Sequence, residues 1–387
     1  MNAQQQTLIS IARCGDPHNR ESVDAAVREA LDLIGGLSSV MSQGDRVLIK
    51  PNILGPYSYE SGAVTNPSVV GAIITAAMEA GAREVVVAES SFVGNDTDES
   101  FKVSGITALC AERGARLVNL DKDDPVPVVV PGGKVLKRLS VPKTALSADV
   151  IINVPVMKTH ILTQVTLSLK NAKGLVCDQI KKRIHKRGLV EGIVDLNRVL
   201  APDLVVIDGT IGMEGWGPMR GEPANRKLIV ASADPVAADA SCAAIMGFDP
   251  NEIDHIRRAG EEGLGTADLS TIRIVGKSLE EVKKPFKRLR FNLEDLPGVN
   301  IIEEAACSGC FYSVQAVIAH LNKNKQMNLL DGYTLVLGQT VKLGPELSGK
   351  ERLLLLGNCL RMYKKHGDYV PGCPPQATKI LEKLESR

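Results

Sequence analysis

The sequence predicts an α/β protein, built on a mostly parallel sheet with helices on both faces and followed by a small C-terminal α/β domain. Strand-like and helix-like segments alternate along most of the chain. The strand-like runs are apolar throughout and do not alternate with polar residues, as in a parallel sheet covered on both faces. A charged segment that contains Pro285 and Pro297 separates the last quarter of the chain from the rest.

The first clear strand is Arg46–Lys50, and residues that favour helix ends mark both ends of the helix after it. Asn66 can cap this helix, Pro67 fits its first position and Gly81 closes it. Further strands are expected at 84–90, 116–120, 149–156, 203–209, 227–232 and 271–276. Further helices are expected at 99–113 and 234–247, and the region 125–142 is typical of an antiparallel hairpin insert.

These elements suggest two domains joined by a linker. We expect residues 1–284 to form the large α/β domain, 285–299 the linker, and 300–387 the small domain. In the small domain a helix is followed by two strands, a Pro-Gly-Cys-Pro-Pro corner and a terminal helix. Ligand sites of open α/β folds usually lie at the carboxyl ends of the strands, so functional residues are sought there.

Composition narrows the class of protein. The chain has 46 Lys and Arg against 45 Asp and Glu, a net charge of +1 that favours neither nucleic acid nor a membrane surface as partner. No apolar run reaches the roughly 20 residues that span a bilayer, and the N-terminus lacks the features of a signal peptide. We therefore expect a cytoplasmic protein, in which the eight cysteines bind metal or are buried rather than forming disulfides.

Four of the cysteines lie in the last quarter of the chain: Cys307, Cys310, Cys359 and Cys373. The first two form a C-x-x-C pair, and the other two each follow a predicted strand. Four thiolates at loop positions suit either a tetrahedral zinc ion or an iron–sulfur cluster, and unmetallated thiols are the third alternative. A cluster several ångströms across accepts such dispersed ligands more readily than a single ion does.

The motifs CSGC, GNC and VPGCPPQATKI resemble the cluster-binding pattern of the nickel–iron hydrogenase small subunit, shared in part by a complex I subunit. The resemblance covers about the last quarter of the chain, and Gly-Cys-Pro-Pro is its most specific part. It implies that the four cysteines bind one 4Fe-4S cluster.

Three motifs in the large domain carry polar candidates: LIKPNILGP (48–56), INVPVMKTHILTQVTLSLKNAKGLV (152–176) and IDGTIGMEGWGPMRGEP (207–223). The lysines follow strands or lie in turns, which favours an anion site for carboxylate or phosphate. The alternative is that these lysines are surface charges and that His160 satisfies a loop carbonyl. We expect His160, Lys170 and Lys158 as catalytic residues, and Lys50, Asn52, Asn171, Lys173 and Glu214 as cofactor-binding residues.

Two further segments accompany these motifs. The segment 207–223 is expected as a glycine-rich loop, and KKRIHKRG (181–188) as a solvated loop. Three residues after the second strand, Glu89, Ser90 and Asp96, are additional polar candidates.

Taken together and in this order, the three motifs resemble the DUF362 family, which has no assigned function; the resemblance spans roughly 46–248. Some DUF362 proteins carry an iron–sulfur module. The region is also similar to the nickel-pincer lactate racemases, which would make Lys170 a cofactor tether, His160 a base and His185 a nickel ligand. The Arg-Pro-Thr-Pro-type phosphate loop of that family is replaced here by KPNILGP.

The sequence thus favours an iron–sulfur redox protein, whose 4Fe-4S cluster exchanges electrons with an anionic small molecule or a redox partner protein. The alternatives are a racemase- or epimerase-like enzyme and a non-catalytic cluster carrier or redox sensor. Whether the chain is an enzyme stays open, with iron–sulfur oxidoreductase as the expected class, and so does homo-oligomer formation.

Overall fold

The computed structural model describes residues 7–288, 299–306, 308–344 and 352–386. The described residues form two compact units, which are treated separately. The larger unit runs to Ile184 and resumes from Val190 to Arg288, and the C-terminal unit holds the described residues after 298 together with His185–Leu189. Most of the predicted linker, 289–298, lies outside the described residues.

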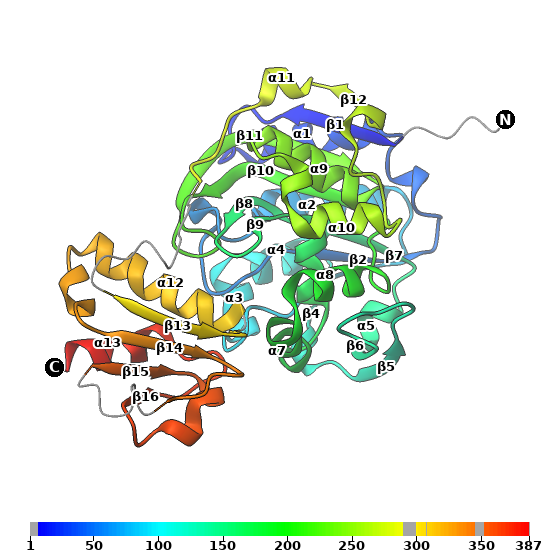
Figure 1. The fold of residues 1–387 in the computed structure, drawn as a ribbon. Coiled ribbons are helices and arrows are strands. Elements are labelled where there is room, and N and C mark those ends of the chain that lie inside the picture. Colours follow the sequence, from blue (N-terminus) through cyan, green and yellow to red (C-terminus); the bar gives the residue numbers. More distant parts are fainter. Residues whose placement is uncertain (1–6, 289–298, 307, 345–351, 387) are drawn as a thin grey trace. The chain divides into compact units, whose positions relative to one another are not determined.

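A ten-stranded sheet forms the centre of the larger unit (Figure 1). Its main path runs β12-β1-β11-β10-β7-β2-β3-β4, and β8 and β9 extend from β10. Only β11 and β9 pair antiparallel with their neighbours, so the predicted α/β class with a mostly parallel sheet is confirmed. The strands are β1 (Leu8–Arg13), β2 (Arg46–Pro51), β3 (Glu84–Glu89), β4 (Arg116–Asn119), β7 (Val150–Val154), β8 (Val156–His160), β9 (Gln164–Thr166), β10 (Leu204–Glu214), β11 (Glu222–Ser232) and β12 (Arg273–Gly276).

Helices surround this sheet. They are α1 (Arg20–Asp32), α2 (Pro67–Glu79), α3 (Thr97–Val103), α4 (Ile106–Arg113), α5 (Lys143–Leu146), α6 (Ser168–Asn171), α7 (Asp178–Arg187), α8 (Leu189–Asn197), α9 (Pro235–Ile245), α10 (Asp254–Glu261) and α11 (Leu279–Val282). The strands β5 (Pro125–Val129) and β6 (Arg138–Pro142) form a separate antiparallel pair. No described helix is both long and apolar enough to cross a membrane.

The start of α2 shows how the sequence sets an element boundary. The Asn66 side chain accepts a hydrogen bond from the Ser68 amide, and Pro67 occupies the first turn. The predicted helix 99–113 is instead two helices, because Gly105 adopts a φ of 84°, a left-handed conformation that interrupts helical hydrogen bonding.

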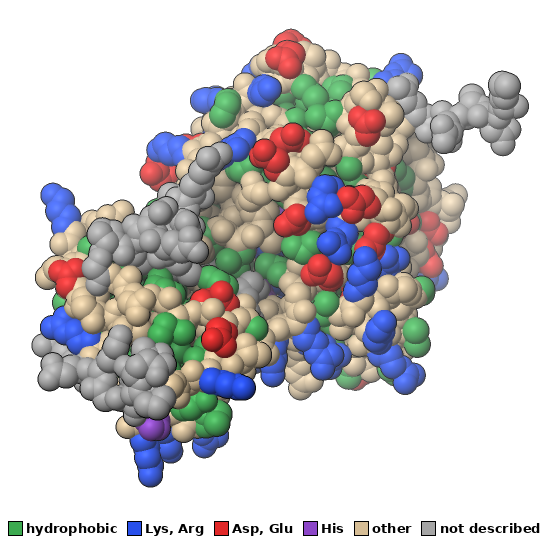
Figure 2. All heavy atoms as spheres, viewed as in Figure 1, with side chains coloured by type: hydrophobic (Ala, Val, Ile, Leu, Met, Phe, Trp, Pro, Cys, Tyr) green, Lys and Arg blue, Asp and Glu red, His purple; other side chains and the backbone are tan. Residues whose placement is uncertain are grey.

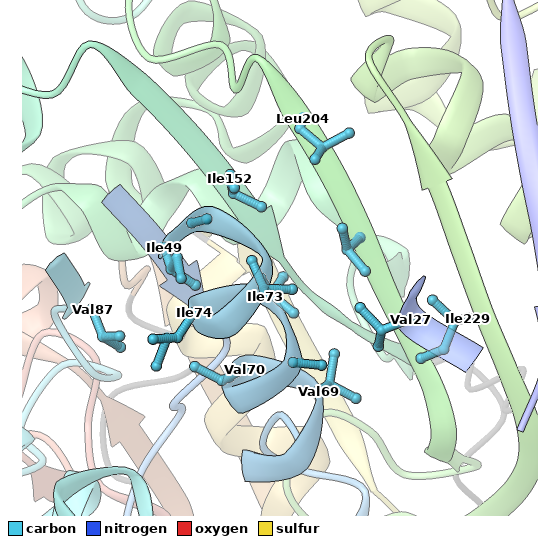
Figure 3. Packing of buried hydrophobic residues seen from close by; sticks show 14 of the residues in the cluster. Val27, Ile49, Val69, Val70, Ile73, Ile74, Val87, Ile152, Leu204 and Ile229 are labelled. Carbon is cyan, nitrogen blue, oxygen red and sulfur yellow. The ribbon is translucent and has the colours of Figure 1, made fainter. Parts of the chain in front are cut away.

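The main core lies between α1, α2 and one face of the sheet. Every second residue of the central strands points into it, including Ile49 of β2, Val87 of β3 and Ile152 of β7 (Figure 3). Ile73 and Ile74 of α2 pack against these side chains. α9 packs against β10, β11 and β1 outside this cluster. This packing holds β2 and β3 in place, and the polar residues of the candidate site lie where these strands end.

The C-terminal unit has its own sheet and its own core. Its four strands are all parallel: β13 (Asn300–Glu304), β14 (Thr334–Gly338), β15 (Leu353–Leu356) and β16 (Asp368–Val370). The helices α12 (Ser308–Lys323) and α13 (Ala377–Glu385) supply apolar residues to the core, such as Val314 and Leu381.

Candidate functional site

A buried ion pair lies where β2 and β3 end. Lys50 Nζ donates to Glu89 Oε2 at 2.8 Å, to the Pro51 carbonyl at 2.7 Å and to Asn171 Oδ1 at 3.0 Å. Glu89 Oε2 also accepts from the Ile53 amide at 3.0 Å. Burial lowers the pKa of Lys50, and the Glu89 carboxylate opposes that shift. Because three acceptors match the three donors of an ammonium group, the geometry fits a charged Lys50.

The segment after α6 rests directly on this ion pair. Gly174 lies in a 3₁₀ turn, and its carbonyl accepts from the Ser90 amide at 2.9 Å. A Cβ atom built at Gly174 would lie 1.8 Å from Glu89 Oε1 and 2.6 Å from Lys50 Nζ. Only glycine therefore permits this approach.

Replacing Gly174 by alanine should lower the free energy of unfolding of the larger unit by about 1–3 kcal/mol, because the new methyl group overlaps the ion pair. Urea unfolding followed by fluorescence of Trp216, the only tryptophan, measures this change. Gly15→Ala is the control, since the nearest atom to its Cβ is a single hydroxyl oxygen at 3.1 Å. Equal midpoints for the two variants would contradict the described contact.

A pocket of about 70 Å³ opens beside the ion pair, and we call it the lysine pocket. This volume accommodates a few water-sized groups, since one water needs about 10–15 Å³. Lysines dominate its polar lining, and the one acidic residue in the lining, Glu89, already binds Lys50. The pocket is therefore cationic overall. Its polar lining residues are Asn52, Glu89, Ser90, Ser91, Lys158, Thr166, Lys170, Asn171, Lys173 and Lys181.

Two of the four lysines that line the pocket, Lys158 and Lys181, are buried, and Lys170 and Lys173 are partly buried. Lys158 of β8 is fully buried and donates to the Ala63 carbonyl at 2.6 Å. Burial lowers the pKa of Lys158 to about 7. Burial, and secondarily the charge of Lys158, lower the pKa of Lys170 to about 7 as well. The pKa of Lys173 lies well below its ordinary value for the same reason, with the charges of Lys170 and Lys181 adding to burial.

Lys181 was not expected in the site. The segment predicted as a solvated loop is mostly the helix α7, whose residues Ile180, Lys181 and Ile184 are buried. Lys181 Nζ donates to the carbonyls of Ser90 at 2.8 Å and of Ser91 at 2.5 Å. The spacing of the two isoleucines, one helical turn apart, is the signal that could have identified an inward face.

Two buried polar atoms in the lining have no hydrogen-bond partner among the described residues. They are Asn52 Oδ1, an acceptor, and Thr166 Oγ1, a hydroxyl. Because buried polar atoms are normally hydrogen-bonded, an acceptor and a hydroxyl left unpaired in one pocket indicate a place for a ligand or ordered water.

Hydrogen bonds from α9 and β7 hold the backbone that carries Lys170. Asp239 accepts from the amides of Ser168 at 2.7 Å and Leu169 at 2.9 Å. Asn171 Nδ2 donates to Asn153 Oδ1 at 2.7 Å. Asp239 is completely buried, and burial raises its pKa to about 8. These hydrogen bonds hold the segment that carries Lys170 in a defined position, as a precise binding site requires.

Three of the expected site residues do not line the lysine pocket: Lys50, His160 and Glu214. His160 Nδ1 accepts from the amides of Leu162 at 3.1 Å and Thr163 at 3.3 Å, which closes the turn after β8. Glu214 binds Arg226 at 2.8 Å across β10 and β11. The structure brings Asn52, Lys158, Lys170, Asn171 and Lys173 together around the pocket, with Lys50 behind it.

The expected glycine-rich loop is mainly two strands, because β10 extends to Glu214 and β11 begins at Glu222. A Cβ atom at Gly212 would lie 2.3 Å from the Met157 carbonyl, and one at Gly217 would lie 2.0 Å from the Thr159 carbonyl. The glycines therefore allow β8 to pack closely on this hairpin.

The cysteines of the C-terminal unit lie at the carboxyl ends of its strands. Cys310 is in the first turn of α12, Cys359 follows β15 and Cys373 follows β16, while Cys307 lies outside the described residues. The Asn358 amide donates to the Gly372 carbonyl at 2.8 Å, which joins the loops of Cys359 and Cys373.

Cys310 lies next to the same loops, because a Cβ atom at Gly357 would be 3.3 Å from its sulfur. Three of the four cysteines are therefore brought to one sheet edge. This arrangement fits dispersed ligands of an iron–sulfur cluster. Within the described part of the chain, no three His, Cys, Asp or Glu side chains form a group that could hold a single metal ion.

An α/β unit with a lysine-lined pocket at its strand ends is compatible with many activities, so the fold alone assigns none. A family model described as "Domain of unknown function (DUF362)" matches residues 47–244, about half of the chain. The "Thylakoid-associated protein sll1697" of Synechocystis sp. is 32% identical over 256 residues, which cover 63% of this chain and 75% of that protein. The chain belongs to the DUF362 family. All lining residues of the lysine pocket fall within the matched range.

Two solved structures are similar at a low level. The lactate racemase apoprotein from Thermoanaerobacterium thermosaccharolyticum matches with a TM-score of 0.42 and 12% identity, over 62% of this chain and 57% of that one. A structural-genomics protein from Thermotoga maritima matches with a TM-score of 0.41 and 11% identity, over 92% of both chains. Neither similarity carries an argument about function.

Proposed function

We propose that the lysine pocket binds a small carboxylate or phosphate compound and that the C-terminal unit holds a 4Fe-4S cluster on Cys307, Cys310, Cys359 and Cys373. The chain would then be an iron–sulfur redox protein that exchanges electrons with its anionic ligand or with a partner protein. The observation that carries the proposal is the pocket lining, in which four lysines face one carboxylate that is already paired.

The physical reason is the cost of unbalanced charge. A buried ammonium group without a counterion is strongly unfavourable, and the lowered pKa values of Lys158, Lys170 and Lys173 express this cost. An anion in the pocket supplies the missing charge and favours the protonated lysines. Binding is therefore expected to stabilise the folded state and to take up protons near pH 7.

Different residues would bind the anion and the cluster. Lys158, Lys170 and Lys173 would contact the anion, while Asn52 and Thr166 would complete its hydrogen bonds. In the C-terminal unit the four cysteines would hold the cluster, which when bound accepts or donates single electrons. The pairing of Asn358 with Gly372 would keep two of those thiolates in place.

The racemase- or epimerase-like alternative also has an observation in its favour. Lys158 and Lys170 have pKa values near 7, the range of an effective general base at neutral pH. Tightly bound nickel, or a covalent adduct on Lys170 in the isolated protein, would favour this alternative.

The sequence also leads us to propose a cytoplasmic location, which cell fractionation can test. Acidic and basic side chains are intermingled on the face of the larger unit shown in Figure 2, so on this face we propose no extended surface for nucleic acid.

Phosphate or a small carboxylate should raise the free energy of unfolding of the larger unit, by about 2.7 kcal/mol at a concentration 100 times Kd. Lys170→Ala should abolish this stabilisation and leave the iron content unchanged. The measurement is thermal unfolding, followed by Trp216 fluorescence, of protein titrated with phosphate, acetate and oxalate.

Lys182→Ala is the matched control, because Lys182 is exposed and does not line the lysine pocket. It should respond to anions as the unchanged protein does. If no anion shifts the unfolding temperature, or if Lys170→Ala responds normally, the proposed anion site is wrong.

A further inference from the structure

Lys170 differs from the other lysines around the pocket in how its amine is held. Lys50 Nζ is bound to Glu89, Lys158 Nζ to the Ala63 carbonyl, and Lys181 Nζ to the carbonyls of Ser90 and Ser91. Within the described residues, Lys170 Nζ makes no hydrogen bond and no ion pair. Its side chain lines the pocket, where no described group competes with a bound molecule for its amine.

The charged groups around Lys170 favour a neutral amine. Lys158 and Lys173 line the same pocket, and the charge of Lys158 adds to burial in lowering the pKa of Lys170. His255 of α10 is buried, and burial and the charge of Lys170 lower its pKa to about 3, so it adds no positive charge at pH 7. Asp239 on α9 is already occupied by two backbone amides. The lowered pKa of Lys170, about 7, agrees with this arrangement. A desolvated lysine beside another cation is a recognised form of activated nucleophile.

We infer that the lysine pocket accepts a small anion that carries a carbonyl group, such as a 2-oxo carboxylate, and that Lys170 forms an imine with it. The inference rests on the proposed anion binding and adds the substrate class and the reacting atom. A simple anion would contact all three lysines, whereas in this compound Lys158 and Lys173 would hold the anionic group and Lys170 would face the carbonyl group. The small volume of the pocket restricts the compound to a few heavy atoms.

The step is balanced and needs no oxidant or reductant. The lone pair of the neutral Lys170 Nζ attacks the carbonyl carbon, a C–N bond forms and the C=O π bond opens to a carbinolamine. The oxygen then leaves with the two former amine hydrogens as one water, and C=N replaces C–N. Asn52 Oδ1 and Thr166 Oγ1, which lack other partners, supply an acceptor and a hydroxyl for the carbinolamine oxygen.

Reductive trapping tests the inference directly. The full-length protein is incubated at pH 7 with pyruvate or glyoxylate and cyanoborohydride, which reduces an imine to a stable secondary amine, and the modified peptides are mapped by mass spectrometry. At pH 7 about half of Lys170 is neutral, against less than one in a thousand for an ordinary lysine. We expect one adduct per chain, on Lys170, formed at least about 100-fold faster than on exposed Lys182.

Variants separate the imine from simple anion binding. Lys170→Arg keeps the positive charge, so it should retain stabilisation by acetate while losing the adduct. Lys182→Arg should keep both, and excess acetate should slow trapping in the unchanged protein.

Stabilisation by acetate without an adduct on Lys170, or labelling spread evenly over surface lysines, would overturn the inference and leave the anion site standing. Absence of both stabilisation and adduct would overturn the anion site as well.

Discussion

Replacing Lys50 by methionine is expected to lower the free energy of unfolding of the larger unit by about 3–5 kcal/mol, because it leaves the Glu89 carboxylate buried without its partner. Both side chains are almost completely buried, so solvent cannot compensate for the lost ammonium group. Urea unfolding followed by Trp216 fluorescence measures the change in the unit that contains the pair.

The double variant Lys50→Met/Glu89→Leu is the control, and it should recover part of the loss because it removes the unpaired charge.

The stability lost by the Lys50→Met variant should depend on pH. Burial raises the pKa of Glu89 in the folded state, and removal of Lys50 raises it further. The folded variant then binds a proton that the unfolded chain releases, so the variant loses stability as the pH rises. The destabilisation should be smaller at pH 5 than at pH 8, and a loss independent of pH would argue against a buried unpaired carboxylate.

Cys373→Ser is expected to remove most of the iron and acid-labile sulfide from anaerobically purified protein, because the last thiolate of the proposed cluster is lost. The unchanged protein should be brown and should bleach on reduction. Iron and sulfide assays with absorbance spectra provide the measurement. Unfolding of the larger unit, monitored at Trp216, should be unaffected because Cys373 belongs to the other unit.

Cys177→Ser is the matched control, since Cys177 lies in the larger unit and should leave the iron content unchanged. Stoichiometric zinc without sulfide in the unchanged protein would show that the cysteines serve another metal. Iron retained fully by Cys373→Ser would exclude this residue as a required ligand.

The parallel part of the sheet could be predicted from the sequence, because the apolar runs and helix caps there match the strands and helices of the folded protein. The apolar runs of β2, β3 and β7 are buried on both faces, and α2 begins at the expected Asn66-Pro67 cap. Most pocket residues were also predictable, because Asn52, Lys170 and Lys173 follow strands or lie in turns at one sheet edge.

The remaining features depend on contacts between distant segments. Gly212 and Gly217 suggested a loop, but their missing side chains make room for the backbone of β8. The basic composition around Lys181 suggested solvent exposure, whereas its amine is bound by carbonyls about 90 residues earlier. Thr166 carries no chemical motif, and its unpaired hydroxyl became visible only in the folded pocket.

The position of β1 has a consequence for synthesis on the ribosome. This first strand lies between β11 and β12, so its neighbours are made more than two hundred residues later. A nascent chain that ends before Arg273 carries an N-terminal strand with one edge unsatisfied, and one that ends before Glu222 carries it without either neighbour. Apolar residues such as Ile9 and Ile11 would stay uncovered during that interval, which exposes the chain to aggregation. Delayed closure of this half of the sheet makes the N-terminal strand the expected binding point for a chaperone during translation.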